Sequence, residues 1–278
     1  MSARLIPSWQ ARLALGFEAR DGRSVLARRE QFGPMAVQKP LYPEGGAVCQ
    51  CVLLHPPGGI AGGDQLTIDL TLDARAHAFI TTPGAAKWYR SVGPVAQQQV
   101  RCHVAAGAVL EYLPQETILF DGCRGDSALH VELASGARYI GWDISVMGRP
   151  ASDEAYLTGV FRQHTTLTLD GKLLLQEQAR LAGGESGLMS RSAYRGCRVA
   201  GTLLAAGVKC SAELLAVCRA LPLAAGALAG LTQLPELLVV RYLGHDAETA
   251  RRYFEQIWAL LRPELIGREA VPPRIWNT

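Results

Sequence analysis

Residues 65–82 read QLTIDLTLDARAHAFITT, and this stretch contains the unit from which the fold is predicted. In QLTIDLTL, leucine and isoleucine at every second position alternate with polar residues. That period-2 pattern is typical of a strand with one buried face. The small-residue connection DARA follows, and a second strand is predicted over residues 77–82. The unit is therefore a strand, a short turn and another strand.

Two later stretches repeat this unit. AAGA at residues 105–108 and ASGA at residues 134–137 each follow an alternating apolar run and precede another predicted strand. The turns recur about every 30 residues, which is a weak repeat. Strand-turn-strand units that stack on their neighbours form a β-solenoid or a layered sandwich, and periodicity alone does not separate the two.

The C-terminal part of the chain has a different pattern. Asp170-Gly171 separates two alternating runs and predicts a β-hairpin. Ser211 is expected to cap a short helix, and Asp246 a longer one. Pro263 should end the longer helix, because proline lacks the backbone N–H that a helix uses.

These elements predict a mainly β fold with a few α-helices in the C-terminal third. A single domain is expected over residues 1–278. It divides into a β-strand body at residues 1–186 and a mixed α/β part at residues 187–278.

Composition limits the classes of function. The formal net charge is +3, with Lys+Arg 28 against Asp+Glu 25, and the arginines are scattered along the chain. This distribution argues against a nucleic-acid-binding surface.

The chain shows no export signal and no apolar run long enough to span a bilayer, so a cytoplasmic location without membrane contact is expected. The seven cysteines are then expected to be reduced and buried.

HPPGGIAGGD, at residues 55–64, is the stretch richest in conformationally special residues. It could cradle an anion, but it lacks the ending of a nucleotide-binding P-loop, and a structural turn is the alternative. The loop residues singled out are His55, Pro56, Pro57, Gly58, Gly59, Gly62 and Gly63.

Cys49, Cys51 and His55 share one parity along a predicted strand and could bind a metal together. The alternative is that the cysteines are ordinary buried core residues.

Carboxylates beside apolar stretches form a second set of candidates. Asp64, Asp143 and Glu177 would be costly to bury without a partner, so they are candidates for a polar interior path; surface positions are the alternative. No G-x-S-x-G or H-E-x-x-H motif is present, and no catalytic residue is predicted. A hydrolase and a nucleic-acid-binding β module are retained as alternative functions.

The tetrapeptide KWYR combines aromatic and basic side chains. Such residues can stack nucleic-acid bases, but they are also enriched in protein–protein hot spots. A docking surface for a protein partner is the favoured interpretation. The candidates are Lys87, Trp88, Tyr89 and Arg90.

Several longer blocks resemble the urease accessory protein UreD family, called UreH in some species. They follow in order along nearly the whole chain, and the first three are long and specific. The blocks are LLHPPGGIAGGDQL (53–66), TTPGAAKWYRS (81–91), EYLPQETILFDG (111–122), GWDISVMGRP (141–150), RYLG (241–244) and PPRIWNT (272–278).

The resemblance implies a right-handed β-helix-like body and no catalytic activity. It implies binding to UreF, recruitment of UreG through UreF, docking on apo-urease subunits, and a dimer as one option within that complex. Nickel would be in transit, with no permanently bound cofactor and no firm metal ligand. Family residues proposed along its route correspond to Asp64, Asp143 and Glu177. Ala86 and Gln65 depart from the family pattern, where a hydroxyl residue and an arginine are common.

Overall fold

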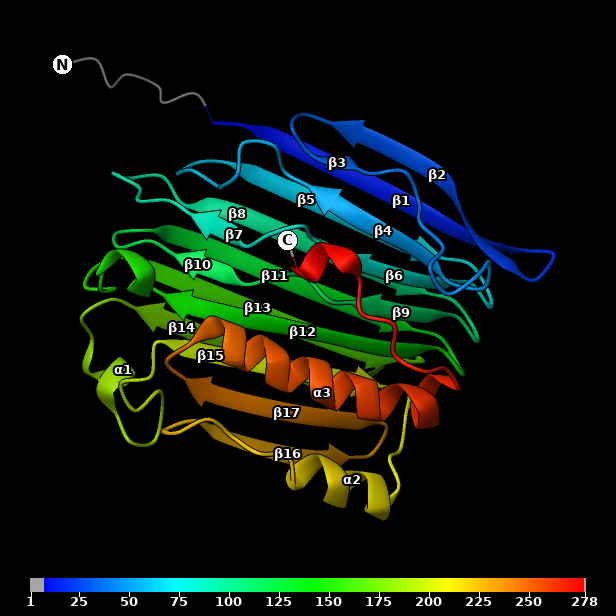
Figure 1. Cartoon of the computed structure of the whole chain (residues 1–278). Helices are drawn as coiled ribbons and strands as arrows, with labels where there is room; N and C mark the ends of the chain where they lie inside the picture. The colour runs from blue at the N-terminus through cyan, green and yellow to red at the C-terminus, as the bar shows by residue number, and fades with distance from the viewer. Residues whose placement is uncertain (1–7, 278) are drawn as a thin grey trace.

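Two β-sheets lie face to face in the computed structural model, which describes residues 8–277 (Figure 1). The first sheet has seven strands. Their order is β14 (Lys172–Ala182), β13 (Val160–Leu169), β11 (Arg124–Leu133), β8 (Ala96–Val104), β5 (Gln65–Leu72), β1 (Gln10–Arg20) and β2 (Arg23–Phe32).

The second sheet has ten strands, and eight of them form a continuous order. That order is β16 (Leu228–Leu234), β17 (Leu237–Gly244), β15 (Val199–Ala206), β12 (Arg138–Met147), β9 (Val109–Tyr112), β6 (His77–Thr81), β4 (Cys49–Leu54) and β3 (Ala36–Val37). Two short strands, β10 (Thr117–Leu119) and β7 (Ala86–Trp88), pair beside the end of β12.

The chain coils between the two sheets. β5 leads to β6, β8 to β9 and β11 to β12, each through a four-residue turn. Within each sheet the strands of these three units pair in parallel, for example Gln65 with Gln97 and Gln97 with Asp126. Parallel stacking of this kind is the arrangement of a β-solenoid rather than of an antiparallel sandwich. The predicted fold class, mainly β with a solenoid-like stack and helices in the C-terminal part, is confirmed.

The third residue of each turn has a left-handed backbone. Gly107 and Gly136 have φ of +67° and +70°, a conformation that glycine adopts without a steric penalty. Arg75 occupies the same place in DARA with φ of +63°. The repeat is weak in sequence because one of the three turns uses a non-glycine residue there.

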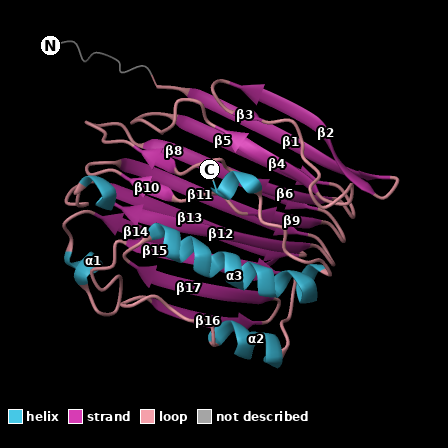
Figure 2. Cartoon of the chain, in the orientation of Figure 1, coloured by secondary structure: helices cyan, strands magenta, loops and turns pink. Residues whose placement is uncertain are grey.

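Helices cover the outer face of the second sheet. Helix α3 (Ala247–Ile266) lies across β12, β15 and β17, as Figure 2 shows. Helix α2 (Ala212–Arg219) contacts both α3 and β16. Short helical turns complete the set: α1 (Ser186–Met189), η1 (Pro150–Ser152) and η2 (Arg274–Asn277). β15, from the predicted C-terminal part, pairs with β12 of the predicted body. No helix within residues 8–277 is long and apolar enough to cross a membrane.

Two apolar cores result from these layers. One fills the space between the sheets, and the other lies between the second sheet and the helices. β12 contributes to both, because Tyr139 faces the first core and Ile140 and Ile144 face the second. All seven cysteines are unpaired and buried, as expected.

One local prediction differs from the structure, and one hairpin was missed. Pro263 does not end α3 but lies inside it; the helix continues to Ile266 and ends at Gly267, whose φ is +73°. The loss of one N–H donor is tolerated because Leu261 and Leu265 remain anchored in the core. A second Asp-Gly hairpin, at Asp21-Gly22 between β1 and β2, was not predicted.

A buried charge network fastens α3 to the solenoid. Glu111 of β9 accepts hydrogen bonds from Trp258 Nε1 at 2.6 Å and from Arg262 Nε and Nη2 at 2.9 Å each, and its Oε1 lies 2.7 Å from His77 Nε2. Arg262 also forms two hydrogen bonds with Glu44, at 2.7 and 2.9 Å. Burial alone raises the pKa of Glu111, but the hydrogen bonds from His77 and Arg262 outweigh it and lower the pKa to about 2.

We predict that Arg262→Met destabilises the protein by about 3 to 5 kcal/mol, because it leaves the buried Glu111 carboxylate and Glu44 without their cation. Urea unfolding at neutral pH measures the difference. Arg252→Met is the matched control. It removes an exposed pair with Glu248 on the same helix and should cost about 0.5 kcal/mol or less. Equal losses for the two variants would contradict the role given to Arg262.

Candidate functional site

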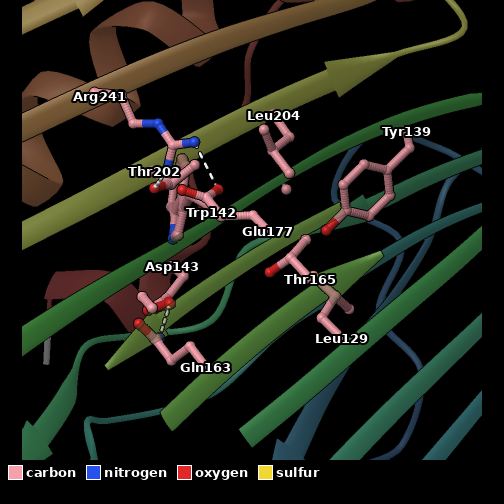
Figure 3. A pocket seen from close by; sticks show the side chains of 12 residues that line it. Leu129, Tyr139, Trp142, Asp143, Gln163, Thr165, Glu177, Thr202, Leu204 and Arg241 are labelled. Carbon is pink, nitrogen blue, oxygen red and sulfur yellow. Dashed lines mark hydrogen bonds and ion pairs between the residues drawn. The ribbon is translucent and has the colours of Figure 1, made fainter. Parts of the chain in front are cut away.

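A small cavity opens between the two sheets beside the edge strand β14 (Figure 3). Its volume is about 70 Å³, enough for several water molecules. One wall comes from β12, β15 and β17, and the other from β11, β13 and β14. Two of the three predicted path residues, Asp143 and Glu177, line it. We call it the acidic cavity.

Asp143 projects from β12 into this cavity. Its carboxylate accepts a hydrogen bond from Gln163 Nε2 of β13 and one from Ser145 Oγ at 3.4 Å. Burial raises the pKa of Asp143 to about 6, against the lowering effect of the bonds from Gln163 and Ser145, and the charge of Glu177 raises it further. The carboxylate is therefore ionised at neutral pH although it has only neutral donors beside it.

Glu177 lies at the outer side of the same cavity. It forms an ion pair with Arg241 of β17, with Glu177 Oε2 2.6 Å from Arg241 Nη2. Nη1 of the same guanidinium donates to Thr202 Oγ1 at 2.6 Å. Both charged side chains are partly exposed, at 36% for Glu177 and 44% for Arg241. The ion pair thus joins β14, the edge strand of the first sheet, to β17, the strand next to the edge of the second sheet, where the cavity meets solvent.

Asp64 does not line the acidic cavity. Its Oδ1 accepts the backbone N–H of Trp9 and its Oδ2 that of Ala61, each at 2.8 Å. The carboxylate therefore ties the HPPGGIAGGD loop to the start of β1. These two amides occupy both oxygens, and the Ser–His–Asp contact that a hydrolase would need is not formed at Asp64.

The HPPGGIAGGD loop is shaped by close contacts. A Cβ at Gly59 would lie 2.3 Å from the ring of Tyr89, and a Cβ at Gly62 would lie 2.2 Å from Ser91 Oγ. These positions need glycine because a neighbouring side chain fills the space where their own would be. The loop is thus a packed turn, which was the alternative to an anion cradle.

The predicted docking tetrapeptide is only partly exposed. Lys87 and Arg90 are exposed, and Tyr89 is half-buried against Phe120. Trp88 is buried and packs edge-on against Phe161, with 4.8 Å between ring centroids. The side chain of Trp88 therefore does not belong to an outer surface. Its direction follows from β7, which turns every second side chain inward.

Cys49 and Cys51 are core residues. Both are fully buried between the sheets, and Cys49 Sγ lies 3.7 Å from Tyr42 Oη. Within the described part of the chain, no three His, Cys, Asp or Glu side chains are grouped closely enough to hold a metal ion. The acidic cavity can therefore offer a cation two carboxylates and neutral oxygens, but no closed ligand set.

Several residues of the acidic cavity carry no signal in the sequence that places them there. Arg241 stands in the quoted RYLG block, but nothing in the sequence showed that it faces Glu177. Ser145 stands in the quoted GWDISVMGRP block, but nothing in the sequence showed its contact with Asp143, and Gln163 and Thr202 belong to no quoted block. Their roles follow from strand pairing, which sets Asp143 opposite Thr202 and Thr202 opposite Arg241 in the second sheet.

Comparison with known proteins gives a consistent result. The profile of the UreD urease accessory protein family matches residues 10–277. The urease accessory protein UreD of Azoarcus sp. (strain BH72) is 48% identical over 98% of this chain and 95% of its own length. The UreD of Dechloromonas aromatica (strain RCB) is 48% identical over 98% and 96%. That of Pseudomonas savastanoi pv. phaseolicola is 47% identical over 100% and 98%.

We predict that Asp143→Asn stabilises the protein at alkaline pH. The folded pKa of Asp143 lies above the ordinary value of 3.8, so its contribution to stability is full below about pH 4 and is lost as the pH rises through about 6. At pH 8 the variant should gain up to about 3 kcal/mol over the wild type. Urea unfolding at pH 4 and pH 8 measures this. An equal gain at both pH values would contradict the role of ionisation.

We also predict that Asp64→Ala destabilises the protein by about 1 to 3 kcal/mol, because two partly buried backbone amides lose the charged acceptor that ties them to the loop. Hydrogen exchange at the N–H groups of Trp9 and Ala61 should accelerate. Asp69→Ala, which removes a carboxylate paired with Arg12 on the outer face of the first sheet, should cost less than about 1 kcal/mol. If Asp64→Ala keeps wild-type stability and exchange, the structural role assigned here is wrong.

Proposed function

Because this chain belongs to the UreD urease accessory protein family, we propose that it is a non-catalytic scaffold that supports nickel insertion into apo-urease. UreF would bind it directly and recruit UreG, and the assembly would dock on the urease subunits. Nickel is the cargo of this process and not a resident cofactor. The site of action would be the cytoplasm, without nucleic-acid or membrane partners.

The convergence of Asp143 and Glu177 in one cavity is the observation that best supports nickel passage. The two carboxylates come from different sheets and share one cavity that has room for water. A protein that hands a metal on needs ligands that hold it weakly. Nickel stands high in the affinity order of divalent metals, so a closed site rich in Cys and His would retain it. Two carboxylates with water offer transient binding instead.

Arg241 fits the same function. In the structure its guanidinium neutralises Glu177. A cation that enters the acidic cavity would replace the guanidinium as the partner of Glu177, and the guanidinium would recover Glu177 when the cation leaves. Competition of this kind lowers the net affinity for the cargo, because each binding event breaks an ion pair.

Two surfaces are proposed for the protein partners. Around α2 and β16, the apolar side chains of Val217, Leu228 and Leu234 are exposed, which favours UreF docking on part of the C-terminal region. Lys87, Tyr89 and Arg90 form a candidate surface at another place in the fold. A dimer within the accessory complex is compatible with both surfaces.

A complementation assay tests this function. The chain is expressed in a urease-positive cell that lacks its own UreD, and nickel content and urease activity are measured. We expect Asp143→Asn and Glu177→Gln each to lower nickel-dependent activity several-fold, and the double variant to approach the level without UreD. Co-purification with UreF verifies that each variant is folded.

Glu132→Gln is the matched control. Glu132 pairs with His103 on the outer face of the first sheet, so its loss should leave activation unchanged. Full activation by the double variant, with UreF bound, would refute the path through the acidic cavity. Failure of the wild-type chain to rescue, although soluble and UreF-bound, would refute the proposed function itself.

A further inference from the structure

A second and larger cavity lies between the sheets, on the side of β4 and β5. Its volume is about 320 Å³. Its walls include parts of the HPPGGIAGGD loop, residues 82–87 and residues 112–117. Three sequence blocks that are far apart in the chain thus enclose one space. We call it the Lys87 cavity, after the lysine that lines it.

Most of the lining of the Lys87 cavity is apolar. The apolar side chains come from both sheets and from the segments that connect them: Met35, Leu53, Ile60, Leu66, Ile68, Tyr112 and Pro114. The volume falls at the lower end of the range for small-molecule sites, which is roughly 300 to 1,000 Å³. The size and the apolar walls therefore suit a small organic molecule better than a bare ion.

Polar groups without partners border the same space. Gln115 is only 9% exposed, and its side-chain amide forms no hydrogen bond with any group of residues 8–277. Its backbone is held in place, because the N–H donates to Thr82 Oγ1 at 2.9 Å. The side chains of Thr117 and, from the opposite wall, Gln98 are also unpaired within the described part of the chain. Buried polar side chains are almost always paired, so these groups require an explanation.

Charge separates the kinds of ligand that fit. Among the described residues that line the cavity, Lys87 is the only cation and no carboxylate is present. Burial lowers the pKa of His55, so its imidazole is neutral at neutral pH. The Lys87 side chain is exposed, which places its ammonium at the mouth, and it forms no ion pair within residues 8–277. A cation would be repelled there, whereas an anion would gain from the charge of Lys87.

We propose that the Lys87 cavity binds a small monocarboxylate. The carboxylate accepts hydrogen bonds from Gln115 and Thr117 and lies in the field of Lys87 at the mouth. The apolar chain of the ligand lies deeper, against Leu66 and Ile68 of the first sheet. Such a ligand gives the protein a binding function besides its metal cargo, and the two cavities share no lining residue.

Other ligand classes match the cavity less well. A phosphate or sulfate ion carries more charge than one lysine balances, and it offers nothing to the apolar walls. A purely apolar molecule would leave the Gln115 amide and the Thr117 hydroxyl unpaired. Water could pair with both groups, but it gains nothing from apolar walls. A carboxylate on a short apolar chain satisfies both parts of the lining.

Methionine methyl groups report on this site. Met35 lines the Lys87 cavity, whereas Met189 of α1 is exposed and does not line it. The full-length chain is isotope-labelled at its methionine methyl groups, and NMR follows their signals during titration with sodium hexanoate. Met35→Leu identifies the Met35 signal. We expect that signal to shift saturably, with a dissociation constant of about 1 mM for a ligand of this size, and the Met189 signal to stay unchanged.

Two analogues of the same chain length test the carboxylate. Hexylammonium chloride should leave the Met35 signal unchanged, because it brings a cation to Lys87. Hexanamide should bind about fivefold more weakly than hexanoate, since it lacks the negative charge. If hexanoate does not shift the Met35 signal, or if the three compounds shift it alike, the proposed site is overturned. These wild-type titrations do not depend on how well any variant folds.

Lys87→Met tests the charge at the mouth. It keeps most of the length of the side chain and should weaken hexanoate binding about fivefold. Lys172→Met is the matched control, because Lys172 is exposed on β14 and does not line the cavity. It should leave hexanoate binding unchanged. Equal affinities of the two variants would overturn the role of Lys87 and, with it, the choice of a carboxylate.

Gln115→Leu tests the buried amide. The side chain keeps a similar size but loses its donor, so both hexanoate and hexanamide should bind several-fold more weakly. Wild-type affinity for both compounds would overturn the role of Gln115. All these titrations are read without nickel or urease. A failure here therefore leaves the proposed function untouched, and a failure of complementation leaves this site untouched.

Discussion

The in-register stacking of parallel strands is the constraint on which the rest of the structure depends. Three successive coils pass from the first sheet to the second through turns of the same length, so β5, β8 and β11 stay in register, and β13 pairs in register with β11. Because side chains alternate between the two faces of a strand, this register decides which side chains point into the space between the sheets. A one-residue slip in β11 would turn Ser127 outward and place Asp126 in the core.

The same register brings distant polar residues together. In the first sheet it aligns Gln98, Ser127 and Gln163 across three strands. In the second sheet it aligns Asp143, Thr202 and Arg241. Where the two sets face each other, Gln163 donates to Asp143. A site of this kind needs no special loop, since the stacking that forms the core also positions the polar residues inside it.

Sequence reasoning succeeded where structure follows from local pattern. The alternation in residues 65–82 predicted β5 and β6 because a half-buried strand requires it. No local pattern shows that Trp88 is buried, since the space that its indole ring fills is left by Gly125 on β11 of the facing sheet. In the glutamine run before Val100, the parity of Val100 and Cys102 could have identified Gln98 as the inward residue. The meeting of Asp143 with Glu177 depends on pairings between strands, which one sequence does not display.

Two interior carboxylates, Glu111 and Asp143, show why the acidic cavity stands out from ordinary polar packing. Glu111 is surrounded by donors that include the guanidinium of Arg262, and those hydrogen bonds hold its pKa at about 2. Asp143 has only an amide and a hydroxyl as donors, with a second carboxylate nearby, and its pKa rises to about 6. Arg262 supplies a positive charge to Glu111. Arg241, by contrast, pairs with Glu177 and not with Asp143. An ionised carboxylate kept in the interior without a cation of its own costs stability, and a cation that arrives from outside and leaves again would offset that cost only while it is bound.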